Sequence, residues 1–197
     1  IYHCLPENSN AAVKIFIACR LLKEKGVYQY IDAAKIVKEQ HPNAEFLLVG
    51  TPYLDNPNTV KQVEIDSWSE QGVITYLGHR NDIPDVFSSS NIVCLPSFYG
   101  EGVPKVLIEA AACGRAIVTT DNPGCRDAVI EGETGLTVPI RDAKALATAI
   151  LKLIEQPELR VAMGAKARVF AEKEFDVNSV VNKHLEIYNN LLSRVEK

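Results

Sequence analysis

Short apolar segments alternate with longer amphipathic ones along the chain, and this alternation restricts the folds that it can form. The short segments are apolar throughout, as at 46–49 and 92–95, which is typical of parallel strands covered on both faces. Each is separated from the next by a stretch with helical features, such as 27–40. We therefore expect an α/β fold with a doubly wound parallel sheet of about six strands.

The expected strands are 13–18, 46–49, 73–77, 92–95, 116–119 and 135–138. The expected helices are 27–40, 59–71, 83–89, 106–112, 142–155, 158–173 and 177–194. We expect a single domain over residues 1–197, with its C-terminal helices in 142–195. Ligands of such sheets bind at the carboxyl ends of the strands, so the loops that follow the strands are the candidate site.

The charge distribution argues against a polyanionic partner. The chain has 21 Lys and Arg against 25 Asp and Glu, a formal net charge of −4. Residues 1–100 carry 8 cations against 11 carboxylates, and residues 101–197 carry 13 against 14. Neither half is basic, so we expect no nucleic-acid partner. A small anionic ligand remains open, because it needs only a few well-placed cations.

Cysteine and histidine spacing predicts neither disulfides nor a metal site. The five cysteines are odd in number and form no CxxC pair, and the four histidines are scattered. We expect reduced thiols in a cytoplasmic protein. No apolar run approaches the roughly 20 residues that span a bilayer, and no signal-peptide pattern is visible. Because the chain does not begin with Met, we expect it to be part of a longer protein.

Two cations stand in the loop after the first expected strand. Arg20 and Lys25 lead into the helix at 27–40. Cationic side chains at a helix start are able to clamp a diphosphate, since the helix dipole adds to their charge. A solvated, charged turn explains the same residues. The loop is neither a Walker loop nor a GxGxxG fingerprint.

The loop after the strand at 92–95 is the most informative. Gly100 and Gly102 flank Glu101 and allow close approach of a ligand to the backbone, and a helix start follows that suits an anion. Glu109 lies about two helical turns later in an apolar helix, where a carboxylate is costly without donors such as sugar hydroxyls. A solvent-facing side chain is the alternative for both glutamates.

Loops after two other strands carry weaker signals. His79 and Arg80 follow the third strand, where they are placed to flank a nucleotide base or ribose. The turn at 119–127 follows the fifth strand and would border the same cleft. An ordinary surface loop is the favoured explanation of His79 and Arg80, and a plain turn with Asp121 as a cap explains 119–127 as well as a ligand role does.

Several stretches, taken in their order and spacing, resemble the C-terminal half of glycosyltransferase family 4, whose members are retaining enzymes of the GT-B fold. They are Arg20 to Gly26, Gly78, Glu101 to Pro104 with Glu109 and Ala110, Gly114 to Thr120, and Glu131 to Gly135. The similarity extends from about Val13 to Tyr188. The stretch 101–115 looks closest to bacterial members that build lipid-linked glycans, capsules or O-antigens from UDP-sugars.

The resemblance implies roles for individual residues. Arg20 and Lys25 match the catalytic pair that binds the donor diphosphate and stabilises it as the leaving group. Glu101 matches the catalytic glutamate next to the donor-sugar hydroxyls, and Glu109 matches the glutamate on the ribose hydroxyls. The other donor-binding positions that the resemblance implies are Gly102, Val103, Pro104, Gly78, His79 and Arg80.

The resemblance also implies a substrate and a partner domain, but no cofactor and no metal. The expected substrate is a nucleotide sugar, with a UDP-sugar favoured. Family members carry an N-terminal Rossmann-like domain that supplies most of the acceptor site, and we expect it to be missing here, which would leave the isolated chain inactive. Peripheral contact with the inner face of the membrane through that domain remains open. The apolar stripes of the C-terminal helices should pack on the sheet, or be exposed where that domain would cover them.

Two alternatives remain open, a binding module and a related enzyme. A non-catalytic nucleotide-sugar-binding module predicts donor binding without turnover. A nucleotide-sugar 2-epimerase of the same fold would need further acid–base residues, many of them from the missing half. A receiver-like signalling domain is not supported, because Arg20 and Pro96 follow strands after which such a domain carries acidic residues. The family's usual glycine before Arg20 is Cys19 here.

Overall fold

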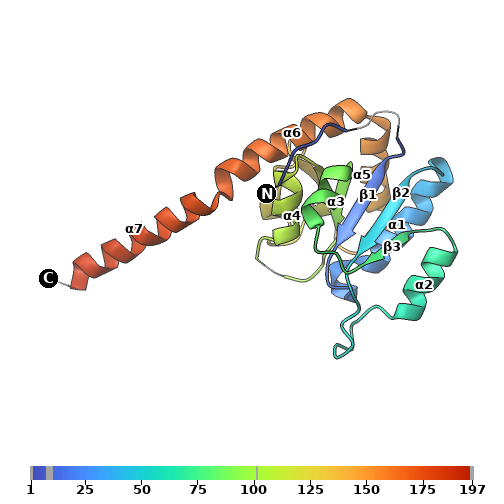
Figure 1. Cartoon of the computed structure of the whole chain (residues 1–197), viewed down its shortest axis with the longest axis horizontal. Helices are drawn as coiled ribbons and strands as arrows, with labels where there is room; N and C mark the ends of the chain where they lie inside the picture. The colour runs from blue at the N-terminus through green and yellow to red at the C-terminus, as the bar shows by residue number, and fades with distance from the viewer. Residues whose placement is uncertain (1, 8–10, 101, 196–197) are drawn as a thin grey trace.

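The computed structural model describes residues 2–7, 11–100 and 102–195, and within these ranges the strands form one six-stranded parallel sheet (Figure 1). The strands are β1 (Lys14–Ala18), β2 (Glu45–Val49), β3 (Thr75–Gly78), β4 (Ile92–Leu95), β5 (Ala116–Thr120) and β6 (Gly135–Val138). The α-helices are α1 (Val27–Gln40), α2 (Gln62–Glu70), α3 (Ile83–Ser89), α4 (Lys105–Ala112), α5 (Ala143–Glu155), α6 (Pro157–Glu174) and α7 (Val177–Val195). Two short 3-10 helices are η1 (Lys23–Lys25) and η2 (Arg126–Ala128).

The strand order is β3-β2-β1-β4-β5-β6, which confirms the doubly wound arrangement. The chain adds β2 and β3 on one side of β1 and then crosses to the other side for β4, β5 and β6. The direction of winding therefore reverses between β1 and β4. The loops that leave these two strands meet at the carboxyl edge of the sheet, where ligands bind in folds of this class.

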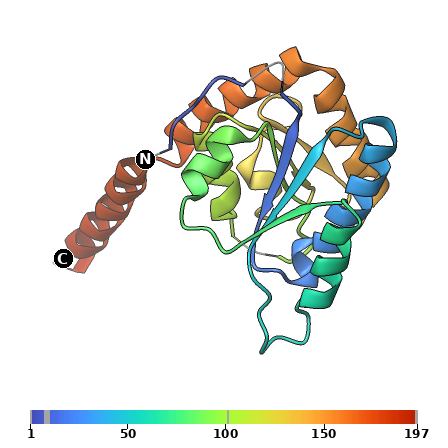
Figure 2. The same ribbon diagram turned by 45° about the vertical axis from the view of Figure 1, so that its right-hand side comes forward.

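Helices cover both faces of the sheet, so the central strands are buried on both sides (Figure 2). Along β1, Ile15 and Ile17 belong to the core that α1 and α5 cover. Phe16 and Ala18 alternate with them and belong to the core beneath α3, α4 and α6. The Phe16 ring meets the ring of Phe87 edge-on, with 5.1 Å between centroids. This two-sided burial is the physical reason why the central strands are apolar along most of their length.

The helix expected at 59–71 begins at Gln62 instead. Thr59 forms an antiparallel bridge with Leu22. The Val60 amide donates to the Leu21 carbonyl at 2.8 Å. The stretch before α2 is therefore extended, and its backbone pairs with the backbone of the loop that follows β1.

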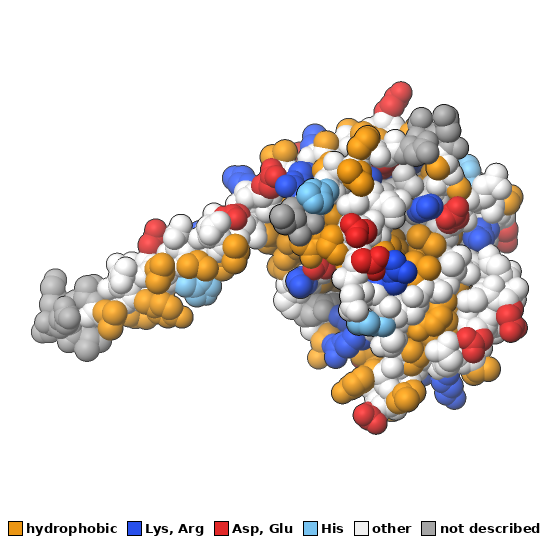
Figure 3. All heavy atoms as spheres, viewed as in Figure 1, with side chains coloured by type: hydrophobic (Ala, Val, Ile, Leu, Met, Phe, Trp, Pro, Cys, Tyr) orange, Lys and Arg blue, Asp and Glu red, His pale blue; other side chains and the backbone are white. Residues whose placement is uncertain are grey.

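The last helix leaves the body of the domain. α7 projects away from the sheet, and its apolar side chains lie along one side of it (Figure 1, Figure 3). Leu185, Tyr188 and Leu192 are 52%, 57% and 64% exposed. Of the two expectations for the apolar stripes, exposure holds for α7 and packing against the core holds for Leu151 of α5. None of the helices in the described ranges has the length and apolarity to cross a membrane.

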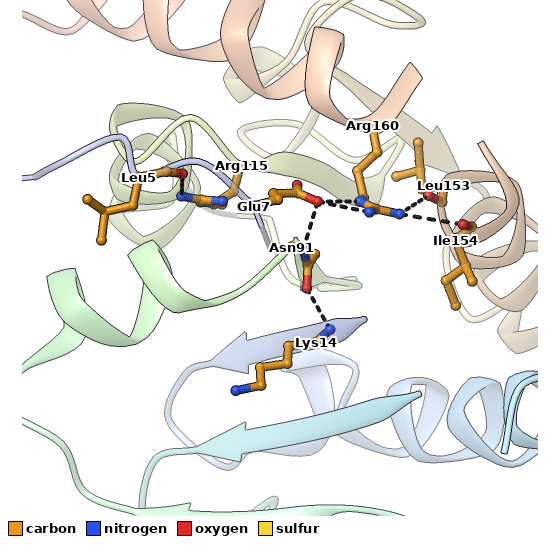
Figure 4. A network of polar contacts seen from close by, with 8 residues as sticks. All are labelled: Leu5, Glu7, Lys14, Asn91, Arg115, Leu153, Ile154 and Arg160. Atoms are coloured by element: carbon orange, nitrogen blue, oxygen red, sulfur yellow. Dashed lines mark hydrogen bonds and ion pairs between the residues drawn. The ribbon is translucent and has the colours of Figure 1, made fainter. Parts of the chain in front are cut away.

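The segment before β1 is fixed to the domain by a buried ion pair (Figure 4). Glu7 accepts hydrogen bonds from Arg160 Nε at 2.9 Å and from Asn91 Nδ2 at 2.7 Å. Arg160 also donates to the Leu153 carbonyl at 2.6 Å, and Asn91 Oδ1 accepts from the Lys14 amide at 2.8 Å. A single carboxylate thus links α5, α6, β1 and the residue before β4.

Replacing Glu7 by alanine should lower the free energy of unfolding by about 3 kcal/mol, because the Arg160 guanidinium would stay buried without its counter-charge. Glu133→Ala is the matched control. Its partner Lys166 lies 3.8 Å away and both side chains are 60% exposed, so the loss should stay below about 1 kcal/mol. Urea unfolding followed by circular dichroism measures both variants. Equal losses would contradict the structural importance of the buried pair.

Candidate functional site

The β1–α1 and β4–α4 loops are joined into one unit at the carboxyl edge. The Glu24 carbonyl accepts hydrogen bonds from the Phe98 amide at 2.9 Å and from the Ser97 hydroxyl at 3.2 Å. Gly26 has a φ of +79°, and a Cβ atom there would lie 2.1 Å from the Pro96 carbonyl oxygen. Only glycine meets both conditions without strain. The two loops that the sequence singled out therefore form one surface.

Residues that follow β5 hold the β4–α4 loop from its other side. The Thr120 hydroxyl donates to the carbonyl of Ser97, which is itself fully buried. The Asn122 side-chain amide donates to the Tyr99 carbonyl at 2.7 Å. These bonds fix the direction in which the chain enters the glycine-rich part of the loop.

An arginine that the sequence analysis missed contacts the same loop. The Arg141 guanidinium lies over the Phe98 ring, 4.4 Å from its centroid. Arg141 has a φ of 60°, and among the described residues it is the one non-glycine with positive φ. The attraction between the cation and the ring holds Phe98 in place. No sequence pattern signals this contact, because Arg141 follows a strand at the opposite end of the sheet from β3.

Arg20 and Lys25 both lie in the β1–α1 loop, as expected, but in different surroundings. Arg20 follows β1 closely and its side chain is exposed, whereas Lys25 ends η1 and is only 9% exposed. Leu21, between them, is fully buried and anchors the loop in the core. α1 starts at Val27, so Lys25 stands near the positive end of a helix. An anion bound here would meet one enclosed charge and one that reaches it from solvent.

The start of α4 is the second helix end at this edge. Glu101, the predicted catalytic glutamate, lies outside the described residues. Gly102 and Val103 are exposed, and Pro104 is buried immediately before the helix. The first amides of an α-helix have no acceptor within the helix, and the dipole adds to their positive potential. The backbone from Gly102 onward is therefore suited to an anion.

Glu109 lies in the middle of α4, with 15% of its side chain exposed. Its Oε1 atom accepts a hydrogen bond from the Tyr2 hydroxyl and lies 3.2 Å from Lys105 Nζ. Burial and, after it, the bond to Glu109 raise the pKa of Tyr2, so the phenol stays protonated as a donor. A groove of about 630 Å³ opens beside the carboxylate, between α4 and α6. Tyr2 is 107 positions from Glu109, and nothing in the sequence signals the contact.

The predicted base-binding residues lie after β3, at the far end of the same edge. Gly78 has a φ of +64°, and the side chains of His79 and Arg80 are exposed. Arg80 Nε donates to Asp82 at 2.7 Å, and this hydrogen bond lowers the pKa of the aspartate. β2 stands between this loop and the β1–α1 loop. The fold therefore places Gly78, His79 and Arg80 on the same edge as the cations but not against them.

Thiols and metal-ligating groups are dispersed. Cys94, Cys113 and Cys125 are buried, and all five cysteines are free of disulfides. Burial raises the pKa of the Cys94 thiol. In the part of the chain that the structure describes, no three His, Cys, Asp or Glu side chains gather in a group that could hold a metal ion. Metal-free chemistry stays a prediction.

A family model described as Glycosyl transferases group 1 matches residues 6–170, which include both joined loops and the whole sheet. The chain belongs to the group 1 glycosyltransferases. This confirms the family resemblance that the loops and helix starts suggested. The parallel sheet with helices on both faces is the Rossmann-like fold found in GT-B glycosyltransferases.

Several known glycosyltransferases and solved structures are similar to this chain. The N,N'-diacetylbacillosaminyl-diphospho-undecaprenol alpha-1,3-N-acetylgalactosaminyltransferase of Campylobacter jejuni is 33% identical over 92% of this chain and 46% of its own length. The capsular polysaccharide biosynthesis glycosyltransferase CapM of Staphylococcus aureus is 29% identical over 90% of this chain and 46% of its own. The crystal structure of Anabaena Alr3699/HepE in complex with UDP aligns with a TM-score of 0.82 and 24% identity, over 91% of this chain and 49% of that one. The glycosyltransferase chain thus spans about half the length of the curated relatives it matches.

Gly26→Ala should destabilise this glycosyltransferase domain more than Gly72→Ala. Both glycines have positive φ, of +79° and +68°, but a Cβ at Gly72 meets nothing within 4 Å. Gly72→Ala should therefore cost only the backbone strain, about 1–2 kcal/mol. Gly26→Ala adds a backbone clash with Pro96 and should also speed hydrogen exchange of the Phe98 amide. Urea unfolding and hydrogen exchange measure the two effects, and equal behaviour of the variants would contradict the described loop contact.

Proposed function

We propose that this chain is the donor-binding half of a retaining glycosyltransferase that transfers a sugar from a nucleoside-diphosphate sugar, with a UDP-sugar favoured, to an acceptor hydroxyl. The observation that carries the proposal is the junction of the β1–α1 and β4–α4 loops. It brings the loop of Arg20 and Lys25 and the starts of α1 and α4 to the point between β1 and β4 where the winding of the sheet reverses. These groups are all positive, so they suit a diphosphate.

The proposed chemistry is stabilisation of the leaving group. When the bond between the sugar and the diphosphate breaks, negative charge builds on the diphosphate, and prearranged positive groups lower the energy of that state. Lys25 is enclosed and supplies a fixed charge, whereas the exposed Arg20 is free to form a bidentate contact with phosphate oxygens. The start of α4 supplies backbone donors. No resident cofactor is required, and the nucleotide sugar is the substrate.

The nucleoside part is assigned to carboxylate and loop contacts. We assign Glu109 to the ribose hydroxyls, because a carboxylate accepts two hydroxyl donors and a groove opens beside it. Gly78, His79 and Arg80 are assigned to the base. Glu101 is assigned to the donor-sugar hydroxyls, with Gly102, Val103 and Pro104 around it, on the family resemblance.

The names of the relatives support the kind of product. The Campylobacter jejuni protein is named for transfer to a diphospho-undecaprenol glycan, and the Staphylococcus aureus protein for capsular polysaccharide synthesis. The Anabaena structure contains UDP. We therefore favour a UDP-sugar donor and surface-glycan synthesis. A lipid-linked acceptor would place the reaction in the cytoplasm at the inner face of the membrane.

The acceptor site is assigned to a preceding domain. The chain spans about half of its curated relatives, and α7 carries an uncovered apolar stripe (Figure 3). The stripe consists of Val177, Val180, Val181, Leu185, Tyr188, Leu191 and Leu192. We assign this face to the N-terminal domain, so that the isolated chain binds donor but does not turn it over.

Calorimetric titration of the chain with UDP and GDP tests the donor site. UDP should bind more tightly, and Arg20→Ala and Glu109→Ala should each weaken UDP binding by about tenfold, since each removes a charge-assisted hydrogen bond. Glu45→Ala is the matched control, because this exposed carboxylate starts β2 at the opposite edge of the sheet. UDP binding that neither Arg20→Ala nor Glu109→Ala weakens would overturn the assignment, and preferred GDP binding would overturn the choice of base.

The full-length protein tests the reaction. With a panel of UDP-sugars and an isoprenyl-diphosphate-linked acceptor, the product's anomeric proton, followed by NMR, should keep the configuration of the donor. Arg20→Ala should lower kcat by about 100-fold, because it removes stabilisation of the departing diphosphate. An inverted product would overturn the retaining mechanism. Unchanged kcat in the variant would overturn the role of Arg20.

A further inference from the structure

The segment that precedes β1 runs across α3 and α4 and brings Tyr2 to Glu109. The His3 carbonyl accepts a hydrogen bond from the Ser88 hydroxyl of α3 at 2.8 Å. The Tyr2 carbonyl accepts one from Arg168 Nη1 of α6 at 3.2 Å. Contacts to two different helices therefore hold the backbone at Tyr2 and at the residue that follows it.

The Tyr2 side chain is itself held by packing. Its ring packs against the core cluster beneath α3, α4 and α6, which Val106 and Ala112 of α4 also contact. Its hydroxyl donates to Glu109 Oε1. Tyr2 also lines the groove beside Glu109. The ring of Tyr2 is thus packed against the core next to α4, and its hydroxyl is hydrogen-bonded to the Glu109 carboxylate.

The two partners of Glu109 differ in rigidity. Lys105 approaches the same Oε1 atom at 3.2 Å, but its side chain is 85% exposed and contributes little fixed geometry. Tyr2 has only two side-chain torsions to order and is packed. Among the described residues Oε2 makes no hydrogen bond, so this oxygen stays available to an incoming donor.

We propose that Tyr2 is a positioning residue for Glu109: its hydroxyl holds Oε1 so that Oε2 is presented to the ribose hydroxyls of the donor nucleotide. This inference rests on the proposed role of Glu109. Without the hydroxyl, the carboxylate turns toward Lys105 or solvent and must be reoriented before it binds a ribose. Tyr2 acts on ribose binding through its hydrogen bond to Glu109.

The test compares UDP with 2′,3′-dideoxyuridine diphosphate, which lacks both ribose hydroxyls, by calorimetry on the chain and its variants. Tyr2→Phe keeps the ring packing and removes the hydroxyl. It should weaken UDP binding by about tenfold, as for loss of one hydrogen bond to a charged group. It should change binding of the dideoxy analogue by less than about twofold, because that ligand makes no contact with Glu109.

Tyr28→Phe is the matched control. The Tyr28 hydroxyl also donates to a carboxylate, that of Glu64, and lies 3.0 Å from both of its oxygens. The Tyr28 ring packs against Trp68 on the opposite face of the sheet. Removing the hydroxyl should leave the ratio of the two affinities unchanged. The comparison separates loss of a tyrosine–glutamate bond in general from loss of the bond at Glu109.

Each other outcome is decisive. If Tyr2→Phe weakens both ligands equally, the residue is only structural, and the inference is overturned. If Glu109→Ala weakens UDP but Tyr2→Phe does not, the inference fails while the ribose assignment stands. If Glu109→Ala leaves UDP binding unchanged, or the chain does not bind UDP, the proposed donor site fails and the inference fails with it.

Discussion

The backbone contact between Gly26 and Pro96 is the constraint on which the carboxyl edge depends. The connection after β1 leads to β2, and the connection after β4 leads to β5 in the opposite direction along the sheet. The first residues of the two connections lie next to each other at this point. The absence of a side chain at Gly26 lets the two loops touch, and the Glu24 carbonyl then joins them by two hydrogen bonds. The backbone of the β1–α1 loop is thereby held at a fixed distance from the start of the β4–α4 loop. A site with fixed positive groups needs little rearrangement when charge develops on a ligand.

This concentration of positive charge is local. The chain as a whole carries a net charge of −4, so long-range attraction does not explain binding of an anion. Arg20 and Lys25 instead lie in the loop that leads into α1, at the same edge of the sheet as the start of α4, and a diphosphate bound there would meet favourable charges at close range. Ligand binding should therefore stabilise the folded state in addition to occupying the site.

The strands were predictable because two-sided burial makes most of their positions apolar, and the candidate loops were predictable because they follow those strands. The start of α2 could not be predicted. Val60 is apolar and so fits a helix face, but its backbone is extended and its side chain is buried beside the β1–α1 loop. The contact of Tyr2 with Glu109 and that of Arg141 with Phe98 join distant positions that no local pattern relates. The sequence could not decide whether α7 is exposed, for a different reason. An amphipathic stripe predicts that a helix face is covered, but it does not identify the surface that covers it.

Backbone hydrogen exchange with and without UDP tests the central claim most directly, since it locates the ligand without any substitution. Binding at the joined loops should slow exchange in 20–27 and 102–109 and leave the amino edge of the sheet unchanged. A cavity of about 680 Å³ at that opposite edge, lined by residues that include His41, Asn43 and Glu45, offers the competing location. Protection confined to the amino edge, or absent from both loops, would contradict the account.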